Sequence, residues 1–269
     1  MKYIVDHDYH IHSELSECSS DPLQTPKRLL EYAKRSGLTD ICVTDHFWDE
    51  RVPGASDWYK PQNLAHVKNS LPLPTEDGVR FRFGAETEMD KFFTVGMSLP
   101  CFDEFEFVII PTTHMHMRGF VISDADADSN LRRAELWVQR LDKLLDMPLP
   151  FRKIGIAHLA CGLLNNRSRA DYLETLSFIS DDEMRRVFTK AAEAGCGIEL
   201  NRFDVGVNDS EVDAVYRMFR IAKECGCKFY LGSDAHHPSE LESAIAVFER
   251  AVDILGLTED DKFRIGEQL

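Results

Sequence analysis

Short runs of apolar residues alternate along the chain with longer stretches whose apolar residues recur at helical spacing. The short runs predict strands at Tyr3–Tyr9, Asp40–Thr44, Val79–Ala85, Phe105–Pro111, Lys153–Ala157, Gly197–Leu200 and Lys228–Leu231. The longer stretches predict helices at Pro26–Ser36, Asp126–Leu145, Asp181–Ala194, Ser210–Glu224 and Ser239–Leu255. Thr25 before Pro26 predicts an N-cap, and Ser180 with Glu183 predicts a capping box.

This repetition of strand and helix predicts an α/β fold with a parallel sheet covered by helices. Seven strands without a Gly-rich dinucleotide turn favour a closed TIM-like barrel that forms a single domain over residues 1–269. Two connections are long, Phe47–Asp77 with Trp58 and Tyr59, and Leu159–Ser180. Long loops in compact domains are often functional lids, although these aromatic residues could also simply pack the loop onto the barrel.

The 269 residues include 46 acidic and 31 basic ones, which gives a formal net charge of −15. Such acidity argues against nucleic-acid binding, which depends on Lys and Arg neutralising phosphates. Seven dispersed cysteines do not form a disulfide framework and indicate a reducing, cytoplasmic compartment. No apolar run approaches the ~20 residues of a membrane helix, so we expect no membrane partner.

Metal-ligating residue types gather where the predicted strands end. In a barrel these carboxyl ends form the rim on which active sites are built. The ends carry His10 and His12, Asp45 and His46, Glu86 and Glu88, His114 and His116, His158, and Asp234 with His236 and His237. Burying so many unpaired ionisable groups together is costly, so they predict a metal site rather than coincidental polarity.

The first strand ends in Asp8-Tyr9-His10-Ile11-His12. Strand side chains alternate with period 2, so Asp8, His10 and His12 are expected on one face and Tyr9 and Ile11 on the other. Two imidazoles ~7 Å apart along one face can converge on one metal ion, or they can simply hydrogen-bond to each other. The many His, Asp and Glu side chains exceed what one tetrahedral site uses, so we expect two or three ions that share a carboxylate.

In this order the residues resemble the polymerase and histidinol phosphatase (PHP) family. The matching motifs span most of the chain: His10-Ile-His12, Thr44-Asp45-His46, Gly84-Ala-Glu86, His114, Ala157-His158 and Gly232-Ser-Asp234-Ala-His236. The resemblance implies a distorted (β/α)7 barrel with a trinuclear centre of divalent Zn, Mn or Fe. It implies one metal bound by His10, His12, Glu86 and Asp234, a second by Glu86, His114 and His158, and a third by His46 and His236.

Two positions depart from this pattern or stay open. Where family members usually carry Asp or His after the first motif, this chain has Glu17 and Cys18, so the third metal is the least secure. His116 could take the place of His114. Asp8 is expected to hold an imidazole in its tautomer. Arg202, Arg118 and Arg167 are candidates for the substrate phosphate, each with a surface salt bridge as the alternative.

The favoured function is hydrolysis of a small phosphate ester, with L-histidinol phosphate as the substrate that the resemblance suggests. A hydroxide that bridges two ions held by Glu86 would attack phosphorus, and Asp234 or His236 would protonate the leaving alcohol. A metal-dependent amidohydrolase is the alternative, although no Lys stands at the middle strand ends to bridge its metals. A metal-binding accessory domain without turnover is a third hypothesis.

Overall fold

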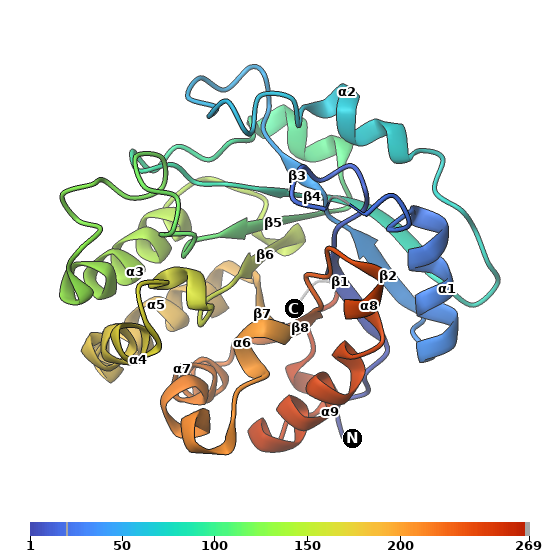
Figure 1. Cartoon of the computed structure of the whole chain (residues 1–269). Coiled ribbons are helices and arrows are strands. Elements are labelled where there is room, and N and C mark those ends of the chain that lie inside the picture. The colour runs from blue at the N-terminus through green and yellow to red at the C-terminus, as the bar shows by residue number, and fades with distance from the viewer. Residues whose placement is uncertain (20, 267–269) are drawn as a thin grey trace.

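Parallel strands form a twisted sheet that curls round until its edges meet (Figure 1). The computed structural model describes residues 1–19 and 21–266, and within them seven strands follow the order β1-β2-β4-β5-β6-β7-β8. These strands are β1 His7–Ile11, β2 Asp40–Val43, β4 Arg80–Thr87, β5 Phe107–Pro111, β6 Ile154–Ala157, β7 Gly197–Asn201 and β8 Lys228–Gly232. A short strand, β3 His46–Phe47, follows β2 after Thr44 and Asp45 and pairs with β4.

Two hydrogen bonds close the barrel between its first and last strands. The backbone N–H of Asp234 donates to the His10 carbonyl at 2.7 Å, and the N–H of His12 donates to the Ala235 carbonyl at 3.1 Å. The predicted seven-stranded barrel is therefore confirmed as one domain. Its closing contacts also bring the end of β1 against the segment that follows β8.

Helices cover the outside of the barrel (Figure 1). Their bounds are α1 Pro26–Ser36, α2 Leu64–Val67, α3 Asn130–Leu145, α4 Arg169–Phe178, α5 Asp181–Ala194, α6 Arg202–Val205, α7 Val212–Glu224, α8 Pro238–Leu241 and α9 Ala244–Leu255. In the described part of the chain, none of them is long and apolar enough to cross a membrane. Thr25 caps α1 as predicted, by accepting a hydrogen bond from the Arg28 N–H.

Three details of the predicted helices are wrong. Ser180 caps α5, but the Glu183 carboxylate binds Arg186 instead of completing a capping box. The last predicted helix is divided into α8 and α9. The connection Leu159–Ser180 contains α4, whose apolar residues do not form one continuous face, so its sequence lacks the periodicity that identifies a helix.

A β-bulge in β1 changes which of its side chains face the barrel interior. The register of β1 against β2 shifts between Asp8 and Ile11. Tyr9 packs among aromatic residues of other strands inside the barrel, with its ring 5.7 Å from that of Phe107. The Asp8 carboxylate instead accepts a hydrogen bond from the Tyr32 hydroxyl of α1, so the expected strict alternation is wrong at this strand.

Aromatic side chains fill the closed end of the barrel below the rim. Phe107 lies 5.3 Å from Tyr230 and 5.9 Å from Phe263 between ring centroids. Gly155 of β6 is needed at this level, because an added β-carbon would lie within 2.6 Å of Phe107 and Tyr230 atoms. The buried imidazoles and carboxylates described below lie above this aromatic layer, at the carboxyl end of the barrel.

Candidate metal centre

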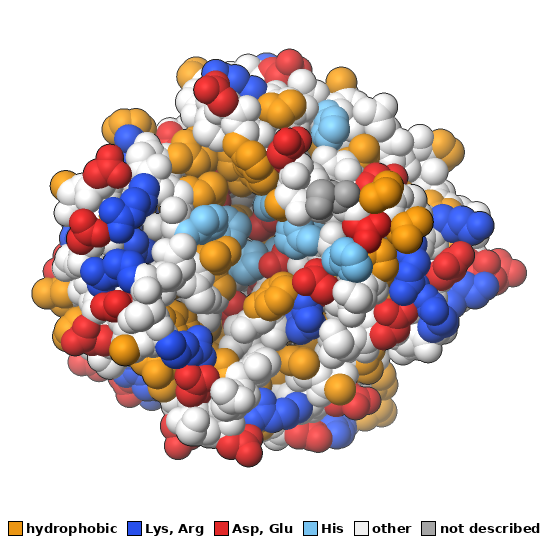
Figure 2. All heavy atoms as spheres, viewed as in Figure 1, with side chains coloured by type: hydrophobic (Ala, Val, Ile, Leu, Met, Phe, Trp, Pro, Cys, Tyr) orange, Lys and Arg blue, Asp and Glu red, His pale blue; other side chains and the backbone are white. Residues whose placement is uncertain are grey.

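Eight imidazole and carboxylate side chains from six strand ends meet at the carboxyl rim. They are His10 and His12 from β1, His46 from β3, Glu86 from β4, His114 after β5, His158 after β6, and Asp234 and His236 after β8. A cavity of about 560 Å³ opens onto this group. Figure 2 shows histidine side chains at the bottom of a hollow in this face of the molecule. The sequence predicted this convergence, and these residues lie together.

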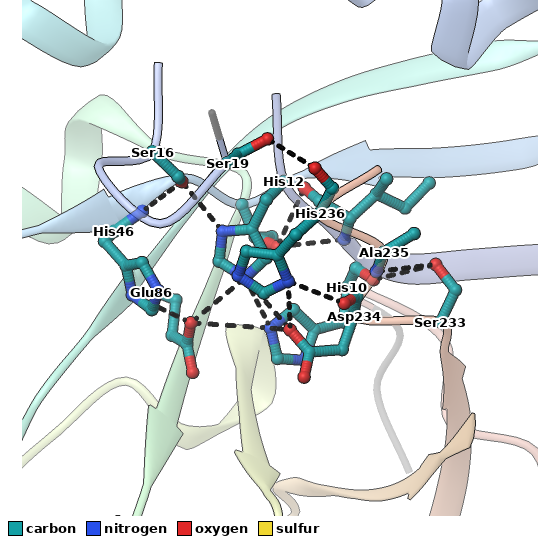
Figure 3. A network of polar contacts seen from close by, with 12 residues as sticks. His10, His12, Ser16, Ser19, His46, Glu86, Ser233, Asp234, Ala235 and His236 are labelled. Atoms are coloured by element: carbon teal, nitrogen blue, oxygen red, sulfur yellow. Dashed lines mark hydrogen bonds and ion pairs between the residues drawn. The ribbon is translucent and has the colours of Figure 1, made fainter. Parts of the chain in front are cut away.

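His10, His12 and Asp234 form the innermost cluster (Figure 3). Their side chains point toward one another: the two Nε2 atoms are 3.1 Å apart, and Asp234 Oδ1 lies 3.3 Å from His10 Nε2 and 3.2 Å from His12 Nε2. Both imidazoles are fully buried. Two ring nitrogens at hydrogen-bond distance from one carboxylate oxygen form an N/O donor set that transition metals accept.

Glu86 lies at the centre of the whole group. Its Oε2 is 3.0 Å from His46 Nδ1 and 3.2 Å from His12 Nε2, and its Oε1 is 3.5 Å from His158 Nε2. His12, His46 and His236 form a further cluster, in which the rings of His12 and His236 stack with centroids 4.1 Å apart. A carboxylate placed between two imidazole clusters can bridge metal ions.

Buried polar atoms at the centre lack hydrogen-bond partners. Both oxygens of Glu86 and Nδ1 of His46 are buried and form no hydrogen bond of acceptable geometry, although Glu86 Oε2 and His46 Nδ1 lie only 3.0 Å apart. Leaving such groups unsatisfied costs about 1–3 kcal/mol each, and more for a charged group. Divalent cations would satisfy all three atoms, so the residues present fit a metal centre.

Hydrogen bonds orient the imidazoles so that Nε2 faces the centre. His10 Nδ1 lies 2.6 Å from Glu199 Oε1, and since a carboxylate can only accept, Nδ1 carries the proton. His12 Nδ1 donates to Ser16 Oγ at 2.8 Å, because the Ser16 hydroxyl itself donates to Asp45. Partners of this kind fix the tautomer and raise the basicity of a ligating imidazole.

Glu199 of β7 is the functional residue that the sequence prediction missed. It lies within the predicted strand Gly197–Leu200, and nothing in the pattern of that strand marks it as functional. The imidazole-holding role that we expected of Asp8 belongs to Glu199. Asp8 instead accepts hydrogen bonds from the backbone N–H groups of Ser233 and His10, and thereby ties β1 to β8.

His114 and not His116 occupies the buried position beside His158. The His114 and His158 rings lie 4.7 Å apart, and His114 Nδ1 is 2.8 Å from Glu88 Oε2. His116 is half-buried and lies farther along the cavity wall. Burial raises the pKa of Glu88 to about 8 and lowers the pKa of His114 to about 3, so burial disfavours the charged form of both side chains.

The imidazoles and carboxylates of the centre shift one another's pKa values. Although burial opposes ionisation, nearby imidazoles hold the pKa values of Glu86 and Asp234 well below the ordinary range. The Glu199, Asp234 and Glu86 carboxylates outweigh burial at His10 and raise its pKa well above 6.5. Asp234 and Glu86 have the same effect at His158. Without cations the site therefore binds protons, which metal ions must displace.

Backbone strain coincides with two of the candidate ligands. His158 and Asp234 have φ angles of 60° and 52°, in the left-handed region that residues with a β-carbon seldom adopt. Strained conformations of this kind cost about 1–3 kcal/mol and cluster at functional sites. Here His158 Nε2 lies 3.5 Å from Glu86 Oε1, and Asp234 Oδ1 lies 3.2 Å from His12 Nε2.

Glu17 and Cys18 do not join the imidazole clusters. Both residues are exposed, and although Cys18 lines the cavity, the described cluster around His46 contains only histidines. A separate buried group that the sequence did not reveal lies behind His158, where Cys161 and Asp204 approach it. Burial raises the pKa of Asp204 to about 7, and its Oδ1 lacks a hydrogen-bond partner.

The three candidate arginines are held away from the cavity. Arg118 pairs with Asp128 at 2.6 Å, and Arg167 pairs with Asp171 at 3.0 Å on the acidic surface. Arg202 donates to the Ser233 carbonyl and lies over the Phe203 ring. None of them lines the cavity in the part of the chain that the structure describes. The salt-bridge alternative therefore holds for Arg118 and Arg167, and Arg202 also lies 3.6 Å from a Glu240 oxygen.

No protein-family model and no curated protein matches this sequence. Two solved structures share the fold. Histidinol phosphate phosphatase (HisK) from Lactococcus lactis subsp. lactis Il1403, complexed with zinc, L-histidinol and phosphate, is 18% identical, with a TM-score of 0.61 over 96% of this chain and 98% of that one. The putative histidinol phosphatase hisK from Listeria monocytogenes is 11% identical, with a TM-score of 0.58 over 90% of this chain and 100% of that one.

Proposed function

We propose that this protein is a metal-dependent phosphoesterase of the PHP family. The observation that carries the proposal is Glu86, a buried carboxylate without a hydrogen-bond partner, with imidazole nitrogens of His10, His12, His46 and His158 within 3.5 Å. The fold that the chain shares with two histidinol phosphatases supports the same reaction class.

Two or three divalent ions of Zn, Mn or Fe would fit this donor set. We assign one ion to His10, His12, Asp234 and Glu86, a second to Glu86, His114 and His158, and a third to His46 and His236. When bound, the ions would lower the pKa of a water molecule and neutralise the phosphate oxygens.

The protein's own groups would position the metal ligands. Glu199 and Ser16 keep the Nδ1 protons of His10 and His12 away from the centre, so that both Nε2 lone pairs are available. Asp234 and His236 both line the cavity, but the pKa values of both side chains are lowered, so the prediction that one of them protonates the leaving alcohol gains no support from their surroundings.

The amidohydrolase alternative receives no support from the cavity. Its bridging lysine has no counterpart, because the described lining contains no lysine side chain. We propose a small phosphate ester as the substrate class. L-histidinol phosphate is the substrate that the family resemblance suggests. The apolar residues that line the cavity favour a different alcohol.

The test compares Glu86→Gln with the surface control Glu249→Gln in protein loaded with Zn, Mn or Fe. We expect the wild type and the control to bind two or three ions per chain and to release phosphate from phosphomonoesters. Glu86→Gln should lose at least one ion and nearly all turnover. If metal-loaded wild type hydrolyses amides but no phosphoester, or nothing at all, the proposal is wrong.

A further inference from the structure

The cavity has an apolar wall on the side away from the candidate ligands. Trp58 and Tyr59 reach it from the connection after β3, Met117 and Phe120 from the loop after β5, and Leu163 from the loop after β6. In Figure 2, hydrophobic side chains border the hollow that contains the histidines. Trp58 and Tyr59 belong to the long connection Phe47–Asp77, for which the sequence predicts either a lid or simple packing onto the barrel. In the structure both residues line the cavity.

The aromatic wall begins directly beside a candidate metal ligand. The Trp58 ring lies 5.0 Å from the His46 ring and perpendicular to Tyr59 at 4.7 Å, and Phe120 lies 5.7 Å from Tyr59. A group esterified to a phosphate at the metal centre would therefore rest against aromatic faces. A cavity of about 560 Å³ has room for a phosphate and an attached ring.

The same cavity offers no partner for a charged alcohol. Its described lining contains neither Lys nor Arg, and its only carboxylates are Glu86 and Asp234, which we assign to the metals. An ammonium group such as that of L-histidinol would be taken out of water without a counter-charge, and this is costly.

Two uncharged donors remain free at the wall. The Tyr59 hydroxyl and Nδ1 of His116 are buried, lack hydrogen-bond partners and belong to residues that line the cavity. Tyr59 is 1% exposed. The Tyr59 hydroxyl can donate to a phosphate or ester oxygen, and His116 Nδ1 can do so in the tautomer that carries the proton there. Neither needs the arginines that turn away from this site.

We propose that the substrate is a phosphomonoester of an uncharged aromatic alcohol, held by Trp58 and Phe120 and hydrogen-bonded by Tyr59. This inference rests on the proposed phosphoesterase function. It concerns the alcohol part of the substrate, which the metal centre itself does not select.

The experiment uses metal-loaded protein and alkyl phosphates whose leaving alcohols differ mainly in charge and shape. 2-Phenylethyl phosphate should have a kcat/KM at least tenfold above those of 2-aminoethyl phosphate and L-histidinol phosphate, a ratio typical of pocket discrimination. Trp58→Ala and Phe120→Ala should each lower the ratio of kcat/KM for 2-phenylethyl over 2-aminoethyl phosphate about tenfold. Phe178→Ala, an exposed control on α4, should leave that ratio unchanged.

A binding measurement separates the two levels of the proposal. Benzylphosphonate, which cannot be hydrolysed, should quench tryptophan fluorescence in the wild type and not in Trp58→Phe. If the protein prefers an aminoalkyl phosphate or L-histidinol phosphate, the aromatic assignment is overturned while the phosphoesterase proposal stands. If benzylphosphonate binds at Trp58 but no phosphomonoester is hydrolysed, the pocket assignment stands and the proposed function is overturned.

Discussion

Replacement of Glu199 by Gln is predicted to weaken metal binding without removing any ligand. Glu199 is buried, and its two oxygens accept hydrogen bonds from different groups. Oε1 lies 2.6 Å from His10 Nδ1, and Oε2 accepts from the backbone N–H of His158 at 3.0 Å. Glutamine keeps the size of the side chain but has one acceptor oxygen, so one of the two donors must face its NH₂ group.

The expected loss follows from this mismatch. An unsatisfied buried donor costs about 1–3 kcal/mol, and loss of an orienting partner typically weakens metal affinity about 10–100-fold, or roughly 1.4–2.7 kcal/mol. The affinity is measured by chelator competition with Zn²⁺ at fixed pH, and Glu249→Gln serves as the surface control. If Glu199→Gln binds Zn²⁺ as tightly as the wild type, Glu199 does not orient His10 for a metal.

Two further changes test how the site is built. Gly232→Ala would place a β-carbon 2.7 Å from that of His10 and against the Glu199 carboxylate. It should therefore destabilise the fold by about 1–3 kcal/mol and weaken metal binding. Gly162→Ala is the control: it has open space around it and should have neither effect. Asp49→Asn tests the loop that carries the aromatic wall. Although burial opposes ionisation, hydrogen bonds from Arg51 and Ser98 hold the pKa of Asp49 at about 2, below its unfolded value. The carboxylate therefore stabilises the fold above pH ~4 and loses this effect as the pH falls toward 2. Denaturant unfolding should show a loss of about 2 kcal/mol at pH 7 and about half of that at pH 3, and an equal loss at both values would contradict the pKa shift.

Much of the site could be predicted because a parallel barrel gathers strand ends at one rim. His10, His12, Glu86, His158 and Asp234 each follow an apolar run, so their convergence requires only the correct fold class. These residues come from distant parts of the chain. Only the barrel topology explains why they meet.

Features that depend on hydrogen-bond register or on distant partners could not be predicted. The bulge between Asp8 and Ile11 has no recognisable sequence pattern, so the prediction that Asp8 shares a strand face with His10 and His12 is wrong. Glu199 acts across the barrel on His10, at a separation of 189 residues. The sequence makes Arg118 and Arg167 candidates for a phosphate contact, but the chain has an excess of acidic residues, and both arginines form ion pairs with nearby carboxylates.

The proposed metal centre depends on Glu86 as the carboxylate that bridges two ions. A crystal structure of the protein reconstituted with Zn²⁺, with anomalous scattering recorded at the zinc edge, tests it most directly. We expect two or three anomalous peaks at the rim, with Glu86 oxygens at ~2.0–2.2 Å from two of them. Peaks only at surface sites, or a Glu86 carboxylate that contacts no metal, would contradict the claim.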